Sequence, residues 1–365
     1  MYPGHITVFN EALQSDNVTE TVAQYNAVSY KAQSKCVQHL THSSFAPAGS
    51  LQLIVSIGEF IVRPSPFDKS GHFYRGNLHS HSTHSDGEKS AEDVCRTYRE
   101  LGYDFLAITD HFMDRFDYPL TPTTSFWSDG FITLPGAELH AGEIELGGFW
   151  HILAVGLPND FQPNLPGETG PQIAQRALEA GAFVAVAHPA WYGVRETDVL
   201  SLGEVHAIEV INGLCGDYND RENSWYLFDQ LTAQGHRYGA IATDDAHFDP
   251  LHQDVQRGWV WVKAESLTPA ALLNALKAGD YYSSTGPIFF DIDIERDRSL
   301  RLRCSPVNHI IITGKGSESV AFHGNGLMEA DLSLEDWKSD YCRITIRDRH
   351  GEKAWSNVIW FDEKS

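Results

Sequence analysis

Short apolar runs, each followed by a polar turn or a helical pattern, recur through the middle of the chain, and this alternation constrains the fold more than any other feature. Continuous apolar runs of about 4–8 residues are typical of strands covered on both faces. Strands that alternate with helices form right-handed βαβ units and a parallel sheet, which at this chain length is expected to close into a barrel. The runs expected to be strands are Tyr103–Thr109, Phe131–Ala137, Phe149–Val155, Ala182–Ala187, Val205–Ile211, Tyr238–Thr243 and Trp259–Val262.

Capping residues predict the bounds of the helices. Ser90 begins a segment with a capping-box-like signature, and Gly102 follows that segment as a stop. Thr268 is followed by a proline in the order of an N-cap and a first helical residue. Two further helices are expected over Pro171–Ala180 and Ser224–Gln234, each followed by a glycine.

The sequence changes character at Ile288, where alternating segments typical of antiparallel strands replace the apolar runs. Ser50–Val62 also has strand composition, and the C-terminal strands are expected to be able to recruit it. A chain of 365 residues is long enough for one large domain and smaller ones. The expected divisions are a partly β extension with a packing role over 1–71, a barrel over 72–290 and a small antiparallel β-domain over 291–365.

The stretch Gly76–Gly87 is rich in histidine and ends in an acidic turn. If Leu78–Ser82 is a strand, His79 and His81 point to the same face, so that one ion can reach both. Asp86 follows in a turn that the final glycine of the stretch makes possible. Alone, such a pair of histidines also occurs in purely structural roles, so the rest of the chain has to decide its meaning.

Most of the expected strands end on, or lie next to, a residue that can bind a metal ion. In parallel barrels the carboxyl ends of the strands form the face on which sites are built. Any one of these residues could begin a solvated loop, but that reading fails for the set because all of them would meet on one rim. The set is His79, His81, Asp86, His111, Glu138, His151, His188, Asp245 and His247.

Charge and cysteine content exclude several classes of protein. The chain has 49 acidic and 27 basic residues and a formal charge of -22, which works against binding to nucleic acids or anionic membranes. The five cysteines are widely spaced and lack a C-x-x-C pair, so reduced, buried thiols are expected. No signal-like or membrane-spanning run is present, and a soluble cytoplasmic protein is the default expectation.

As an ordered set, these motifs resemble those of the PHP (polymerase and histidinol phosphatase) family of metal-dependent hydrolases. The segments Leu267–Pro287 and Ala354–Asn357 resemble a bacterial branch that includes carbaryl hydrolases and many proteins called phosphoesterases. The resemblance covers roughly residues 72–365 and implies a distorted (β/α)7 TIM-like barrel with two or three divalent metal ions, usually manganese, iron or zinc. The motifs that carry it are His79–Gly87, Thr109–His111, Gly136–Glu138, His151, Ala187–Pro189 and Thr243–His247.

The resemblance also implies how the ligands divide among the ions, with Glu138 bridging the first and the second. Mixed imidazole and carboxylate donors independently suit zinc, iron or manganese, and no cysteine is among them. The first ion would take His79, His81, Glu138 and Asp245, the second Glu138, His151 and His188, and the third Asp86, His111 and His247.

Three neighbouring residues leave alternatives open. Asp110 is interpreted as a partner that orients His111 rather than as a ligand. Asp244 and Asp245 are adjacent, and the Asp-x-His spacing favours Asp245. His84 could be a ligand, a proton donor or a loop residue, and the last is favoured.

Hydrolysis is the chemistry that such a centre performs, because divalent cations a few ångströms apart ionise a bridging water and stabilise charge on the attacked group. No G-x-S-x-G or P-loop pattern competes with this reading. Asp245 and the bridging Glu138 are the catalytic candidates, with Asp245 expected to take or relay a proton. Substrate contacts from Arg195, Arg221, Arg237, Tyr192 or Asn212 are conceivable, but no pattern selects among them.

Three functions are consistent with the sequence. The first is a phosphoesterase acting on a small phosphate mono- or diester. The second is hydrolysis of a carbamate, ester or amide, which fold alone cannot separate from the first. The third is a metal-binding module without catalysis, against which the complete ligand set argues. The expected partner is a small, anionic substrate rather than a nucleic acid or a membrane.

Overall fold

A computed structural model describes residues 60–62, 65–295 and 298–363. Most of the expected N-terminal extension, including residues 50–59 of the predicted strand Ser50–Val62, lies outside the described residues, as does Cys36. The last three residues of that predicted strand form β1 (Phe60–Val62), which pairs antiparallel with β17 (Ile359–Glu363). The four described cysteines are free and buried, as the sequence predicted.

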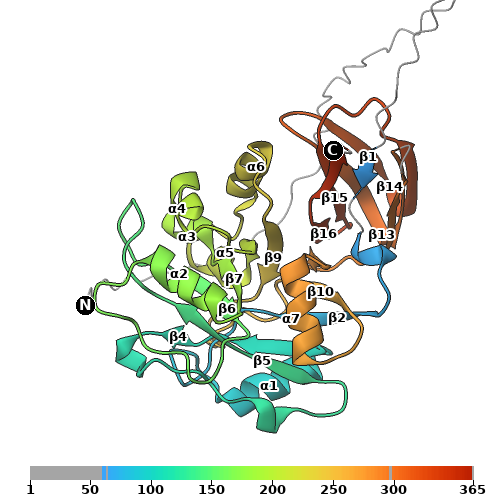
Figure 1. The fold of residues 1–365 in the computed structure, drawn as a ribbon. Coiled ribbons are helices and arrows are strands. Elements are labelled where there is room, and N and C mark those ends of the chain that lie inside the picture. Colours follow the sequence, from blue (N-terminus) through green and yellow to red (C-terminus); the bar gives the residue numbers. More distant parts are fainter. Residues whose placement is uncertain (1–59, 63–64, 296–297, 364–365) are drawn as a thin grey trace, which may run out of the picture. The chain divides into compact units, whose positions relative to one another are not determined.

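The strands predicted from the apolar runs are all present, with small shifts of their ends (Figure 1). Their side chains are buried on both faces, as expected for a sheet covered by helices. The strands that precede the C-terminal region are β2 (His72–Asn77), β3 (Phe105–Ile108), β4 (His111–Phe112), β5 (Ile132–Leu139), β6 (Ile152–Val155), β7 (Phe183–Val186), β8 (Ala207–Asn212), β9 (Gly239–Thr243), β10 (Trp259–Ala264) and β11 (Tyr281–Ser284).

Helices begin where the capping residues predicted. Ser90 and Thr268 each cap a helix through a side-chain oxygen that accepts a backbone N–H. None of the described helices is long and apolar enough to cross a membrane. The described helices are α1 (Ala91–Glu100), α2 (Gly170–Glu179), α3 (Pro189–Tyr192), α4 (Glu196–Ser201), α5 (Gly213–Asn219), α6 (Trp225–Ala233) and α7 (Pro269–Ala278), with short 3-10 turns at Pro66–Asp68, Asp114–Phe116 and Thr124–Phe126.

The sheet is mixed rather than wholly parallel. Strands β2, β3 and β5 run parallel to one another, as do β7, β8 and β9. Between these groups β6 runs antiparallel to both β5 and β7. The Gly147–Gly148 turn therefore leads into a strand of reversed direction, which the apolar run alone could not indicate.

The ladder of strands does not close into the predicted (β/α)7 TIM-like barrel. A strand has two hydrogen-bonding edges, and β2 gives one to β3 and the other to β10, which is antiparallel to it. Strand β9 therefore cannot pair along β2. The segments that follow β2 and β9 meet beyond the ends of these strands, at an isolated parallel bridge between Ser80 and Ala246. The predicted strand over Leu78–Ser82 is accordingly wrong, because β2 ends at Asn77.

Side chains satisfy the edge of β9 that no strand covers. Asn357 accepts a hydrogen bond from the backbone N–H of Ala240 at 2.9 Å. The Ser283 hydroxyl donates to the Ala240 carbonyl at 2.8 Å and accepts from the N–H of Ala242 at 3.0 Å. Asn357 also donates to the carbonyls of Gly279 and Tyr281, both at 3.1 Å. Buried backbone groups need such partners, so these two side chains replace a missing strand.

Alternate side chains of the strands enter two different cores. On β7, Phe183 and Ala185 belong to one buried cluster, while Val184 and Val186 belong to another. The first cluster is shared by β3, β5 to β10 and α7, and the second by strands β5 to β9 and helices α2 and α6. One face of the sheet thus packs against α7, and the other against α2 and α6.

The C-terminal strands are antiparallel, as the sequence predicted after Ile288. Strands β13, β14, β15 and β16 lie together with no helix among them (Figure 1). They continue the sheet through β11, which pairs with β16, and the described residues form one unit. These strands are β12 (Phe289–Ile294), β13 (Ser299–Thr313), β14 (Ser319–Ser333), β15 (Tyr341–Arg347), β16 (Lys353–Ser356) and β17.

We expect Asn357→Ala to lower the free energy of unfolding by about 2–4 kcal/mol, because one backbone N–H and two carbonyls lose their partner. Urea denaturation followed by tryptophan fluorescence measures the change. The matched control is Asn325→Ala at an exposed position of β14, where we expect a change within about 0.5 kcal/mol. Equal stability of both variants would show that the side chain does not hold the edge of β9.

Candidate metal centre

One rim of the sheet gathers the side chains that the sequence singled out. Most follow the carboxyl end of a strand, as predicted. His151 instead precedes β6, and because that strand is reversed, its beginning lies on the same rim. The structure brings all of them together in overlapping groups; these are His79, His81, Asp86, His111, Glu138, His151, His188, Asp245 and His247.

Glu138 lies at the centre of the rim and is completely buried. Its Oε1 is 2.7 Å from Nδ1 of His151 and 3.1 Å from Nε2 of His188. Its Oε2 is 2.6 Å from Nδ1 of His111. Both oxygens of one carboxylate therefore face imidazoles from different strands, the position that a bridging ligand requires.

Asp245 is the second carboxylate of the rim, and it contacts the two histidines that follow β2. Its Oδ1 is 3.1 Å from Nε2 of His79 and 3.0 Å from Nε2 of His81. Its Oδ2 accepts a hydrogen bond of 3.0 Å from the amide of Asn212. The backbone of Asp245 has φ 55°, a left-handed conformation that non-glycine residues seldom adopt and that tends to occur at functional sites.

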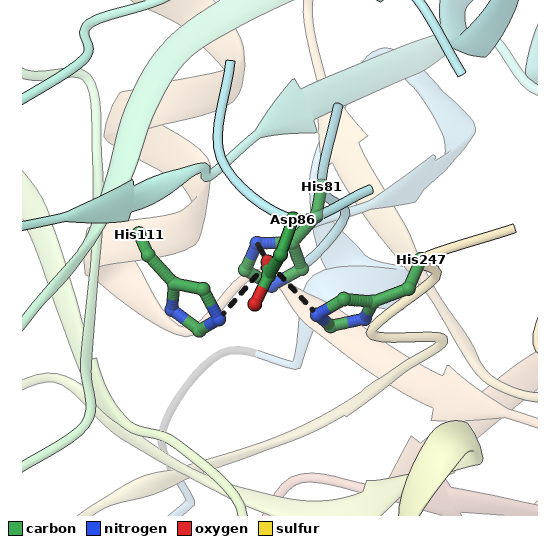
Figure 2. Close-up of side chains that lie close together, drawn as sticks. All are labelled: His81, Asp86, His111 and His247. Atoms are coloured by element: carbon green, nitrogen blue, oxygen red, sulfur yellow. Dashed lines mark ion pairs between the residues drawn. The ribbon is translucent and has the colours of Figure 1, made fainter. Parts of the chain in front are cut away.

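Asp86 is the meeting point of a third group (Figure 2). Its Oδ1 is 3.3 Å from Nε2 of His111, 3.4 Å from Nε2 of His247 and 4.0 Å from Nδ1 of His81. The ligand atoms of these four residues lie within 4.8 Å of one another. Asp86 is half-exposed, so this group opens to solvent whereas Glu138 does not.

His140 belongs to the rim although the sequence analysis missed it. It stands two residues after Glu138, directly beyond the end of β5. Its Nε2 is 2.8 Å from Nδ1 of His111 and 3.7 Å from Oε2 of Glu138. Its Nδ1 is 3.0 Å from the carbonyl of Trp150, which can only accept, so Nδ1 carries the proton. The lone pair of Nε2 therefore points into the cluster. The Glu-x-His spacing at the end of this strand was the signal that could have found it.

Glu209 is the second residue that the sequence analysis missed. Its fully buried carboxylate accepts from Nδ1 of His79 at 2.9 Å and from the backbone N–H of His188 at 2.5 Å. It also accepts from the amide of Asn212 at 3.0 Å and from the hydroxyl of Thr243. Glu209 thus orients two histidines of the rim. An isolated glutamate inside the apolar run Val205–Ile211 was its signal.

The interpretation of Asp110 as the partner of His111 is wrong. Its carboxylate accepts from the backbone N–H of Ser82 at 2.7 Å and from the hydroxyls of Ser82 and Ser85, both at 2.8 Å. Asp110 therefore fixes the loop that carries Asp86. The loop position of His84 agrees with the favoured reading, since it is exposed and contacts Thr121 rather than the cluster.

The adjacent Asp244 faces away from the cluster. It accepts the backbone N–H groups of Arg257 and Gly258 at 2.6 and 2.9 Å and the hydroxyl of Tyr98 at 2.9 Å. Burial raises the pKa of Asp244 to about 6 against the effect of these hydrogen bonds. Of the two aspartates, the structure thus places only Asp245 among the histidines.

Gly87 serves close approach rather than a reversal of the backbone. It is not among the residues with positive φ. A Cβ atom at this position would stand 2.7 Å from the carbonyl of His81, so only glycine fits. Its backbone N–H donates to the carbonyl of Ser82 at 3.0 Å, which closes the turn that presents Asp86.

The carboxylates of the rim are held in the ionised form. Burial alone would raise the pKa of Glu138, but His111 and His151 hold it well below its usual range. Burial opposes ionisation of Asp245 in the same way, and His79 is the main group that lowers its pKa. Both groups are therefore negative at neutral pH.

Two of the imidazoles are held neutral. Burial, reinforced by His247 and His111, lowers the pKa of His81 to about 4. Burial also lowers the pKa of His151 to about 3, with help from His140 and against the attraction of the nearby carboxylate. Ionised carboxylates and neutral imidazoles are the protonation states in which these side chains bind metal ions.

The orientation of the imidazoles fits divalent cations. Nδ1 of His79 donates to Glu209, so the lone pair of Nε2 faces Asp245. Nδ1 of His247 lies 2.9 Å from the backbone carbonyl of Asp245, so its Nε2 lone pair faces Asp86. A lone pair directed at a carboxylate oxygen is repulsive unless a positive charge lies between them. Against the effect of burial, the surrounding carboxylates raise the pKa of His79 well above its usual value. Nε2 therefore binds a positive charge strongly, and a proton or a metal ion can supply it.

Buried atoms without a hydrogen bond mark the same place. Within the described part of the chain, Nε2 of His79 and Oε2 of Glu138 are fully buried and make no hydrogen bond of suitable geometry, although Asp245 and His111 lie 3.1 and 2.6 Å from them. Such atoms are costly to bury unless something else satisfies them. Both belong to groups whose ligand atoms lie within 4.8 Å of one another. The donor set thus fits bound metal ions, with nitrogen and oxygen ligands.

A pocket of about 350 Å³ opens onto the rim. Its floor includes His111, His151, His188, Asp245 and His247. The arginines considered from the sequence do not line it. Arg195 pairs with Glu145 at 3.1 Å, Arg221 donates to the carbonyl of Trp191 at 3.2 Å, and Arg237 stacks on Trp360.

No protein-family profile and no curated protein match this chain. Its fold is similar to that of a two-domain protein from Bacteroides vulgatus containing a predicted PHP-like metal-dependent phosphoesterase, with a TM-score of 0.46 and 15% identity over 76% of this chain and 90% of that chain. A candidate metal-dependent phosphoesterase from Bifidobacterium adolescentis gives a TM-score of 0.36 and 14% identity over 47% and 87% of the two chains. An amidohydrolase from Chromobacterium violaceum with bound sulfate and no metal gives a TM-score of 0.37 and 15% identity over the same shares. These distant likenesses carry no information on activity, so function rests on the site.

We expect Glu209→Gln to weaken the binding of divalent cations by about 10–100-fold, because the neutral amide replaces one of the two acceptor oxygens by an NH2 group that faces hydrogen-bond donors. Competition with a fluorescent chelator measures the affinity. The matched control is Glu204→Gln at an exposed position, for which we expect wild-type affinity. Equal affinities of the two variants would contradict the orienting role of Glu209.

We expect His140→Asn to lower the affinity of one cation by about tenfold or more, because asparagine can still donate to the carbonyl of Trp150 but lacks the Nε2 lone pair. Elemental analysis after equilibrium dialysis measures the number of ions bound at each concentration. His323→Asn, exposed on β14, is the control. Unchanged binding would show that His140 only accepts a hydrogen bond from His111.

Proposed function

We propose that this chain is a metal-dependent hydrolase of the PHP family that cleaves an ester bond in a small substrate, with phosphate esters as the first candidate class. The observation that carries the proposal is the set of buried Nε2 lone pairs directed at carboxylate oxygens, most clearly that of His79 toward Asp245.

The proposed ligands divide into three overlapping groups. The first comprises His79, His81, Asp245 and Glu138, the second Glu138, His151 and His188 with His140 nearby, and the third Asp86, His111 and His247. The chemistry that manganese, iron or zinc supplies in such a setting is the ionisation of a water molecule near neutral pH and the stabilisation of developing negative charge. Glu138 would bridge the first and second groups, since both of its oxygens face histidines.

Asp245 is the proposed proton acceptor. Its Oδ1 faces His79 and His81, while its Oδ2 is fixed by the amide of Asn212 and the residue lines the pocket. A carboxylate held in this way can accept the proton of the attacking water and return it to the departing oxygen. Glu138 is completely buried, so bulk water has no access to it.

Hydrolysis of a carbamate, a carboxylic ester or an amide is the second candidate. The observation that favours it is the lining of the pocket, to which the described residues contribute no lysine or arginine. Phosphate sites commonly use such side chains to bind oxygen anions. A metal-binding module without catalysis remains the third reading, and turnover of any ester by the metal-loaded protein would exclude it.

Several sequence-based expectations stay predictions. These are the division of the chain at residues 71 and 290, a small anionic substrate, the absence of a nucleic-acid or membrane partner, and a cytoplasmic location. The net charge of -22 supports the exclusion of polyanionic partners.

We expect treatment with a chelator to abolish hydrolysis of bis(4-nitrophenyl) phosphate and addition of Mn²⁺, Fe²⁺ or Zn²⁺ to restore it. Asp245→Asn should lower kcat by about 10²–10⁴-fold, because the proton acceptor is lost. Release of nitrophenolate measures both effects, with 4-nitrophenyl phosphate and naphthyl methylcarbamate as alternative substrates.

The control is Asp160→Asn, an exposed loop position for which wild-type kcat is expected. Full activity of a thoroughly demetallated sample would refute metal dependence. Turnover of the carbamate alone would replace the first candidate by the second.

A further inference from the structure

Three aromatic side chains, here called the aromatic wall, line the pocket that opens onto the proposed metal centre. They are Trp191, Tyr192 and Tyr218. The rings of Tyr192 and His151 are stacked, with centroids 4.5 Å apart, and those of Trp191 and Tyr218 are 5.5 Å apart. Tyr218 is 52% exposed, so its ring is available to a ligand that enters from solvent.

The aromatic residues lie close in sequence to residues of the proposed metal centre. Helix α3 begins directly after His188 and carries both Trp191 and Tyr192. Helix α5 carries Tyr218 and is capped by Asn212, the residue that also donates to Asp245. The distance between the rings and the reacting end of a substrate is therefore set by the same residues that shape the rim.

The charges around the pocket disfavour highly anionic ligands. Glu88, Asp86 and Asp249 line it, whereas no described lysine or arginine does. Of the arginines nearby, Arg115 is 3.6 Å from Asp86 and Arg257 is 3.9 Å from Asp217, so each is paired with an acid. Like charges this close repel a second anion by an amount that solvent screens only in part.

We propose that the pocket takes an ester with an aryl group next to the scissile bond and with no more than one negative charge. The aryl group would lie against Trp191 and Tyr218. This inference rests on the proposed function and narrows it, since it favours aryl phosphodiesters and aryl carbamates over phosphate monoesters. A volume of about 350 Å³ is at the lower end of the range for small-molecule pockets.

The reaction is a simple hydrolysis. The oxygen of water forms a bond to the phosphorus or the carbonyl carbon, and the bond from that atom to the aryl oxygen breaks. One proton of the water passes through Asp245 to the departing aryl alcohol, so that no oxidant or co-substrate is needed. The other product is a phosphate monoester or a carbamic acid.

The first test compares three esters of one naphthol on the metal-loaded protein, so that only the charge changes. They are naphthyl methyl phosphate with one negative charge, naphthyl phosphate with two, and neutral naphthyl methylcarbamate. We expect the lowest KM for the first or the third and a KM at least tenfold higher for the second. Glu88→Gln should lower the KM of the doubly charged ester more than that of the carbamate.

The second test removes the aromatic wall. We expect Tyr218→Ala and Trp191→Leu each to raise the KM of the preferred naphthyl ester by about 5–20-fold, the effect of losing one aromatic contact. Tyr218→Phe should restore most of the loss, because the ring is retained. Tyr226→Ala, at a position 80% exposed on α6, is the control and should leave KM unchanged.

Failure of the inference and failure of the proposed function give different results. A lowest KM for naphthyl phosphate, or a KM insensitive to Tyr218→Ala and Trp191→Leu while turnover continues, overturns the inference alone. No turnover of any of the three esters, or of the nitrophenyl esters, by the metal-loaded wild-type protein overturns both.

Discussion

The burial of an ionised carboxylate at Glu138 is the constraint around which the rim is built. A charge without access to water is costly unless neighbours compensate for it. Compensation comes from histidines on three different parts of the sheet, namely His111 on β4, His151 before β6 and His188 after β7. The reversal of β6 is needed for this, because a parallel strand would carry His151 at the opposite edge.

The competition for the edges of β2 shapes the other half of the rim. Because β3 and β10 pair with the two edges of β2, only the residues after β2 can form hydrogen bonds with the segment that follows β9. There the backbone N–H of His81 donates to the carbonyl of Ala246 at 2.8 Å, and that of Asp245 donates to the carbonyl of His79 at 3.0 Å. A barrel would need a ladder of hydrogen bonds between β2 and β9. Two backbone hydrogen bonds replace it, and they bring His79, His81 and Asp245 together.

Local signals in the sequence predicted the helices, the strands and most residues of the rim, but they did not predict which strands pair with one another. Caps such as Ser90 and the apolar runs act within a few residues, so their reading was reliable. Whether β6 runs parallel, and which strand takes each edge of β2, depends on partners far along the chain. Glu209 was missed because it stands inside the apolar run Val205–Ile211, and His140 because it lies beyond the expected strand Phe131–Ala137. The role of each of these two buried side chains becomes evident only when the histidines and hydrogen-bond donors that face it are known.

The acidity of the rim has two effects that oppose each other for an anionic substrate. Carboxylates such as Asp86 raise the local affinity for cations, and bound cations in turn attract the group that is to be hydrolysed. Acids farther out, Glu88 and Asp249, are not among the groups that could hold an ion, so their charge is left to act on whatever enters. Bound cations would neutralise the inner charges but not the outer ones. In the proposed function, selection by charge would therefore take place at the mouth of the pocket, where Tyr218 offers an uncharged, planar contact.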